Sequence, residues 1–179
     1  MALIIETGTG SATAESYISV ADATTYQADR GNAAWAAVAS DTVREQLLRK
    51  ATDFMVEQYR TRWAGGRVLT TQALDWPRYQ VPRLDVYGSS GFGFAGYGLY
   101  YPSDEVPEAV RRACAEFALR AIDGDLGPDL SAPVIREKVG PIEVQYAEGA
   151  RQEVRYSAID KLLEPFLLGS ESLVRVQRA

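Results

Sequence analysis

The sequence predicts a mainly α fold: a small bundle of three to four helices, with a short β-hairpin and extended N- and C-terminal arms. Apolar residues recur at three- and four-residue steps in 42–59 and again in 107–123, which predicts two helices with a buried face. From Val134 onward the apolar period changes to two, which predicts strands. Residues 6–16, by contrast, are small and polar, with no periodic apolar face, and predict an extended arm that could reach a neighbouring subunit.

The length of 179 residues and the 46% hydrophobic content predict one domain with a single core. We divide this domain, 1–179, into consecutive parts. They are an N-terminal arm at 1–18, a helical core at 19–130 that includes a long loop at 61–103, a β element at 131–156, a C-terminal helix at 157–168 and a tail at 169–179.

The first half of the chain carries the clearer helix signals. Ser19 followed by Asp22 predicts a capping box and a helix over 20–30, with a short helical piece over 33–39 after it. Asp41 is the expected N-cap of the longest helix, 42–59. The apolar stripe expected to face the core comprises Val43, Leu47, Leu48, Ala51, Phe54, Met55 and Tyr59.

In the second half, a helix is predicted over 107–123, with Cys114 on its buried stripe as a small core residue rather than a reactive thiol. Strands are predicted at 134–139 and 142–146, and 154–156 is a candidate third strand. The last helix begins at Ser157 and runs through Phe166.

Between these halves, Pro77 ends any helical pattern and Trp76 invites two interpretations. In one, Trp76 fills the core while Asp75 and Arg78 pair across a turn. In the other, Trp76 and Arg78 are an exposed contact, since these residue types dominate interface hot spots.

Two further segments suggest contacts. The segment 87–101 holds many glycines and aromatic residues, and we expect it to become ordered only on assembly. Arg60, Arg62 and Arg67 flank Trp63, which indicates either a basic–aromatic patch for DNA or cations that offset a helix dipole. The candidate interface residues are Trp76, Arg78, Phe92, Phe94, Tyr97, Tyr100, Tyr101, Arg175 and Arg178.

Composition limits the functions to be considered. Histidine is absent and there is one cysteine, so no Ser-His or Cys-His dyad can form, and we expect no enzyme, no cofactor and no metal site. No stretch approaches the ~20 apolar residues of a membrane span. A net charge of −5 argues against a general DNA-binding surface, although 16 of the 19 basic residues are arginines, which favour bidentate contacts.

Four short stretches carry a resemblance to a known family: QALDWPR at 72–78, ESYISV at 15–20, ATDF at 51–54 and VPEAV at 106–110. They resemble the head–tail adaptor (connector or head-completion) proteins of tailed bacteriophages, a family also labelled DnaT-like single-stranded-DNA-binding protein. The resemblance implies a structural protein of the virion neck, assembled in the host cytoplasm as a dodecameric ring. This ring would dock on the portal protein, join it to the next neck or tail-completion protein, and let packaged double-stranded DNA pass without specific binding.

The alternative, implied by the second label, is a single-stranded-DNA-binding replication protein. Salt-dependent binding to oligonucleotides separates the two. From the acidic balance we expect a Kd for single-stranded DNA of about 10⁻⁴ M or weaker at physiological salt.

Overall fold

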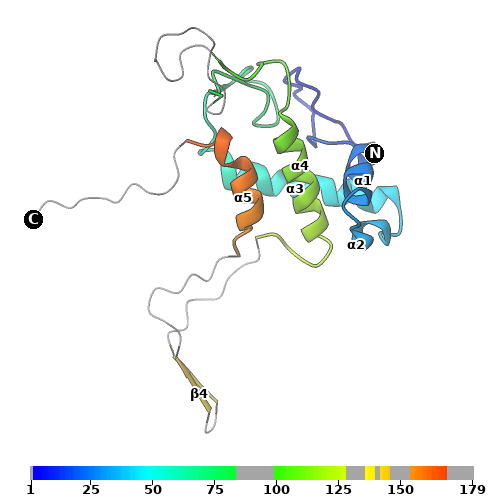
Figure 1. Ribbon diagram of the computed structural model, residues 1–179, viewed down its shortest axis with the longest axis vertical. Coiled ribbons are helices and arrows are strands. Elements are labelled where there is room, and N and C mark those ends of the chain that lie inside the picture. The colour runs from blue at the N-terminus through cyan, green and yellow to red at the C-terminus, as the bar shows by residue number, and fades with distance from the viewer. Residues whose placement is uncertain (1, 84–98, 128–135, 140–141, 146–153, 169–179) are drawn as a thin grey trace, which may run out of the picture.

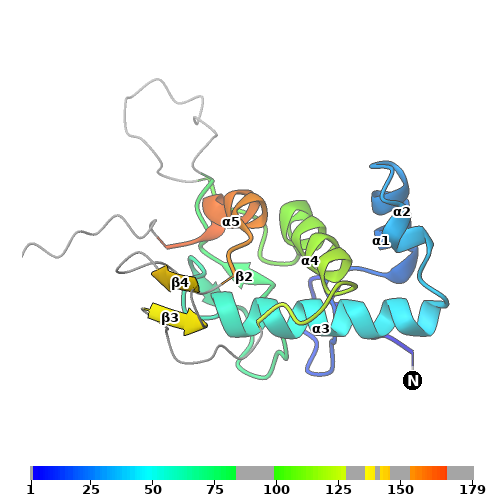
Figure 2. The same ribbon diagram turned by 90° about the horizontal axis from the view of Figure 1, so that it is seen from below.

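The computed structural model describes residues 2–83, 99–127, 136–139, 142–145 and 154–168. Within them the α-helices are α1 (Val20–Ala28), α2 (Ala33–Ala36), α3 (Asp41–Tyr59), α4 (Glu108–Arg120) and α5 (Ser157–Leu163), the last followed by a 3-10 helix, Glu164–Phe166. Helices α4 and α5 lie across α3, and α1 and α2 lie beside the N-terminal end of α3 (Figures 1 and 2). The prediction of a mainly α fold is confirmed.

Helix α3 is the longest element and begins at its predicted place with a different cap. The side chain of Ser40, not Asp41, accepts a hydrogen bond from the Val43 N–H at 3.4 Å. Leu47, Leu48, Ala51, Met55 and Tyr59 are buried as predicted, whereas Phe54 is half-buried and Val43 is 38% exposed. A pattern of apolar residues cannot show where the covering elements end, so it placed the start of the buried stripe one turn too early.

Helix α4 packs against α3 through a face of small and aromatic side chains. The buried side chains of this face are Val110, Ala113, Cys114, Ala115, Phe117 and Ala118. Cys114 is fully buried, with its sulfur 3.4 Å from the Thr52 hydroxyl, and burial raises the pKa of the thiol. The expectation of a core cysteine is confirmed.

The capping box of α1 is also confirmed. The Ser19 hydroxyl accepts a hydrogen bond from the Asp22 N–H at 3.0 Å and donates to the Asp22 carboxylate at 2.7 Å. The helix ends at Ala28, two residues before its predicted end at Arg30.

The prediction of an extended N-terminal arm is wrong, because the segment folds onto its own subunit. Ser16, Tyr17 and Ile18 are all buried in the core. An isolated parallel bridge joins Ile5 and Ser16 within this segment.

A buried carboxylate explains how this polar segment can pack. Glu6 is 2% exposed, and its carboxylate accepts N–H groups from Gly8 at 2.8 Å, Gly10 at 3.0 Å and Ser11 at 2.8 Å. Gly8 has φ +107°, and a Cβ there would lie 1.9 Å from the Asp104 carbonyl oxygen. The chain can therefore pass close to Asp104 only with glycine at this position.

The predicted hairpin forms from β3 (Arg136–Val139) and β4 (Ile142–Gln145), which pair antiparallel with Val139 opposite Ile142. It lies apart from the helices (Figure 1). The candidate third strand at 154–156 is wrong. The Tyr156 ring instead packs edge to face on Phe54 and Phe117, with centroid distances of 5.8 Å and 5.4 Å, and the hydroxyl donates to the Leu126 carbonyl. Aromatic packing thus decides the path of this segment.

Among the described residues, no helix combines the length and the hydropathy needed to cross a lipid bilayer.

Candidate functional site

The segment 72–78 lies inside the fold. Trp76 is fully buried, and its ring meets Trp63 and Phe166 edge to face, each at a centroid distance of 5.7 Å. The peptide bond between Trp76 and Pro77 is cis. The core interpretation of Trp76 is therefore confirmed, and the alternative in which its side chain is exposed is not observed.

Arg78 is also buried, at 6% exposure, and its guanidinium is held by main-chain carbonyls. Nε donates to the Ala64 oxygen at 2.7 Å, Nη1 to the Asp75 oxygen at 3.1 Å and Nη2 to the Gly65 oxygen at 2.8 Å. Burial lowers the pKa of Arg78, and the nearby Asp75 charge opposes that shift. An arginine placed in this way fixes the path of 63–65 and does not present its charge to a partner.

The expected ion pair between the Asp75 and Arg78 side chains is wrong. The Asp75 carboxylate points to the end of α3, where it accepts from Arg60 Nε at 3.0 Å and Trp63 Nε1 at 3.3 Å. The Asp75 main-chain N–H donates to the Tyr17 hydroxyl oxygen at 3.0 Å. Asp75 therefore joins the N-terminal segment, α3 and the turn, a role that depends on residues distant in sequence.

Above this buried junction lies an exposed surface, where Arg60 and Arg67 come close together. Arg67 belongs to β1 (Gly66–Arg67), which pairs antiparallel with β2 (Arg78–Tyr79). Arg60 Nη2 lies 3.5 Å from the Ala73 carbonyl oxygen, and Arg67 Nη1 lies 3.1 Å from that of the adjacent Gln72. The two guanidinium groups therefore share one short stretch of main chain.

Tyr79 belongs to the same surface. It is 47% exposed, and its ring lies against Gly66, where an added Cβ would sit 2.8 Å from the ring. Tyr79 lies opposite Gly66 in the two-stranded ladder, so main chain supports its ring. The exposed side chains of Val68 and Leu69 follow directly in the sequence.

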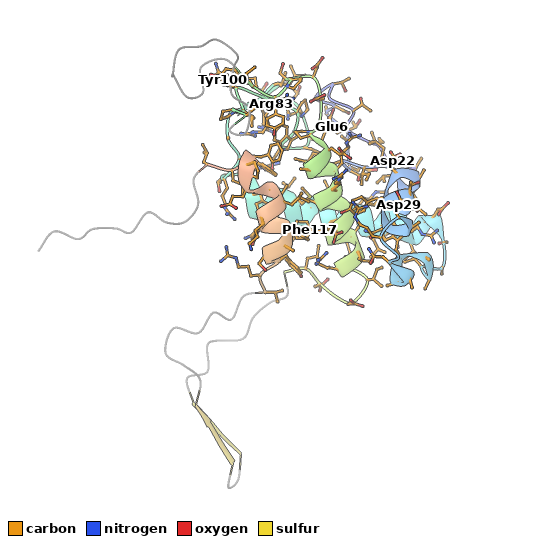
Figure 3. All side chains as sticks on the ribbon, viewed as in Figure 1. Glu6, Asp22, Asp29, Arg83, Tyr100 and Phe117 are labelled. Carbon is orange, nitrogen blue, oxygen red and sulfur yellow. The ribbon has the colours of Figure 1, made fainter. Side chains whose placement is uncertain are left out.

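Arg83 and Tyr100 lie at the same end of the molecule (Figure 3). Their segments are paired, since the Arg83 N–H donates to the Leu99 carbonyl and the Tyr101 N–H donates to the Val81 carbonyl, both at 2.9 Å. The Arg83 guanidinium lies over the Tyr101 ring at 4.7 Å, whereas Tyr100 is 49% exposed.

The candidate interface residues thus separate into three groups. Trp76 and Arg78 are buried, Tyr100 is exposed, and Tyr101 is half-buried against Phe166, with ring centroids 4.9 Å apart. Phe92, Phe94, Tyr97, Arg175 and Arg178 lie outside the described residues, as does most of the segment 87–101.

The arginines near Trp63 do not form the patch that the sequence suggested around that ring, because Trp63 is only 2% exposed. The exposed aromatic residue is Tyr79, which sequence reasoning missed together with Arg83. A usable signal was present: 60–83 contains five arginines and one aspartate, a net +4, so the rest of the −5 chain carries −9. The segment 60–83 is therefore basic within an acidic chain.

A cavity of about 390 Å³ lies between α1 and α4. It is lined by acids such as Asp22 and Glu108 and by bases such as Arg30 and Arg111, and Arg112 and Glu108 already pair with each other. Within the described ranges, no three His, Cys, Asp or Glu residues are placed to hold a metal ion.

The comparisons with known proteins add one finding. A family model described as "Putative DnaT-like ssDNA binding protein" matches residues 1–179. Neither a curated protein nor a solved structure matches the chain. Because the family model covers the chain from end to end, the protein belongs to the family of DnaT-like ssDNA-binding proteins that this model describes.

Proposed function

We propose that the protein is a non-enzymatic head–tail adaptor of a tailed bacteriophage. In this role, copies of the chain form a ring in the virion neck that docks on the portal protein and joins it to the next neck or tail-completion protein. The observation that supports this proposal is the hairpin of β3 and β4, which lies apart from the helices (Figure 1).

A lone two-stranded hairpin is marginally stable in water and gains stability by packing on a larger element. Strands β3 and β4 pair with each other, and the hairpin that they form lies away from the helices. A neighbouring subunit would supply the missing contact. When each copy contacts the next in the same head-to-tail way, the assembly closes into a ring if the rotation allows it.

The resemblance of 72–78, 15–20, 51–54 and 106–110 to adaptor proteins supports the same role. It adds a dodecameric ring, assembly in the host cytoplasm and passage of packaged double-stranded DNA without specific binding. These features are part of the proposal.

The proposal is tested by replacing 136–145 with a short Gly-Ser linker. We expect an unchanged thermal midpoint for the isolated subunit, together with loss of ring formation and of binding to a portal protein. Light scattering and electron microscopy of the mixture measure assembly, and Lys161→Ala on α5 is a control that keeps the hairpin. A variant without the hairpin that still assembles with the portal protein would refute the proposal.

A second candidate function is binding of single-stranded DNA in replication. The description of the family and the net +4 of 60–83 favour it. Sub-micromolar binding to single-stranded oligonucleotides that weakens steeply with salt, with no association with a portal protein, would support this function over the adaptor.

A further inference from the structure

We infer that Arg60, Arg67 and Arg83, together with Tyr79 and Tyr100, form a contact surface for the phosphodiester backbone of DNA. We call these five residues the basic–aromatic face. The inference rests on the DNA-binding candidate above and gives it a location. It does not depend on ring formation, which is measured separately.

The first part of this face is the arginine pair. The Arg60 side chain is 50% exposed although its partner Asp75 is buried, and Arg67 is exposed beside it. Both guanidinium groups are anchored from below, Arg60 by Asp75 and Arg67 by the Gln72 carbonyl. Anchoring limits the freedom that each side chain would lose on binding a phosphate, and the planar guanidinium suits the bidentate geometry of phosphate oxygens.

The second part consists of the aromatic rings. The Tyr79 ring packs on Gly66 and is 47% exposed, and Tyr100 is 49% exposed near Arg83. A half-exposed ring next to a cation is the arrangement with which proteins stack the bases of single-stranded nucleic acids while they contact the backbone. Duplex DNA keeps its bases stacked internally, so it would use only the arginines.

The charge distribution favours a polyanion at this face. Residues 60–83 carry a net +4 within a chain of net −5, so this segment attracts a polyanion more strongly than the chain as a whole. The single acidic residue of the segment, Asp75, is 1% exposed and lies beneath the arginines.

Three phosphate contacts predict a measurable salt dependence. For single strands the slope of log K against log salt is about −0.7 for each phosphate, so three contacts give about −2 and an affinity about 70-fold weaker at about 150 mM than at about 20 mM salt. Loss of one contact reduces this ratio to about 17-fold.

The experiment measures fluorescence anisotropy of labelled oligo-dT and of a duplex of equal length, with Arg67→Gln, Arg83→Gln and the control Arg111→Gln. Arg111 is exposed on α4, and its replacement changes the net charge equally. We expect each face variant to reduce the salt ratio from about 70-fold to about 17-fold, and the control to leave it near 70-fold. Circular dichroism confirms that each variant is folded.

Replacing the two tyrosines shows whether the face binds single-stranded DNA or duplex DNA. If single strands are bound, Tyr79→Ala and Tyr100→Ala weaken binding to oligo-dT by about fivefold or more and leave the duplex unaffected. If the duplex backbone is the ligand, both tyrosine variants bind both DNAs like the parent, and only the arginine variants differ. The inference is overturned if Arg67→Gln and Arg83→Gln behave like Arg111→Gln, or if the parent protein binds neither DNA at about 20 mM salt. Ring assembly, followed by light scattering in the same samples, reports on the adaptor proposal independently.

Discussion

The N-terminal segment and the β3–β4 hairpin lie in different surroundings in the structure. The sequence predicts an extended arm for the first and a hairpin for the second. The N-terminal segment instead buries Ser16, Tyr17 and Ile18 in its own subunit, whereas the hairpin lies apart from the helices (Figure 1).

Polar anchors explain the difference. The N-terminal segment has main-chain N–H groups that lack partners in a helix or sheet, and the Glu6 carboxylate accepts three of them. The hairpin satisfies main-chain groups between its own two strands. Because unpaired polar groups are costly to bury, a segment can enter a core only where such partners exist.

The largest expected effect is on the stability of the core, on which the N-terminal segment packs. Trp76→Ala should lower the free energy of unfolding by about 3–5 kcal/mol, because the ring is fully buried between Trp63 and Phe166. Urea denaturation measures this loss. Unchanged stability combined with lost assembly would show instead that Trp76 acts at an interface.

Glu6→Ala should have the next largest effect, a loss of about 2–3 kcal/mol, since three N–H groups lose a charged acceptor in a buried loop. Chemical denaturation of the variant gives the value, and Glu6→Gln, which keeps one acceptor oxygen, should lose less. A variant as stable as the parent would mean that water replaces the carboxylate, and the anchor explanation of the comparison would fail.

Tyr17→Phe tests a single hydrogen bond of the same segment. The ring would stay in place while the buried Asp75 N–H loses its acceptor, so we expect a loss of about 1–2 kcal/mol, measured by thermal and urea unfolding. Phe54→Leu on α3 is a control that alters an aromatic side chain without touching this junction. Equal or greater stability of Tyr17→Phe would contradict the assigned hydrogen bond.

The smallest effect concerns the ion pair between Glu15 and Arg49, whose side chains meet at 3.0 Å. The hydrogen bond from Arg49 lowers the pKa of Glu15 below its ordinary value of 4.5. A lowered folded-state pKa stabilises the fold above the unfolded pKa and loses that contribution as the pH falls through the folded value. The parent should therefore melt slightly above Glu15→Gln at neutral pH, and the two melting temperatures should converge as the pH is lowered to about 3. A constant difference across this range would exclude the pair as the cause.

The helices and the hairpin can be predicted from the amino-acid sequence, because the signals for them are local. Periodicity placed α3 and α4 close to their observed bounds, the Ser19–Asp22 capping box gave the start of α1, and the period-two pattern gave β3 and β4. The sequence also indicated a core role for Cys114 and, as one of two alternatives, for Trp76. Helix turns and strand ladders depend on neighbouring residues, so their patterns can be seen in one chain.

The partners of charged and polar side chains could be identified only from the folded structure. Asp75 pairs with Arg60 rather than Arg78, the Arg78 guanidinium is held by carbonyls of 64, 65 and 75, and Glu6 becomes a buried anchor. The fold also placed the Arg60 and Arg67 guanidinium groups at the adjacent carbonyls of Ala73 and Gln72, and left Tyr79, rather than Trp63, exposed. The physical reason is that a hydrogen bond or ion pair depends on position in space and on burial, and the two residues that form it can be far apart along the chain.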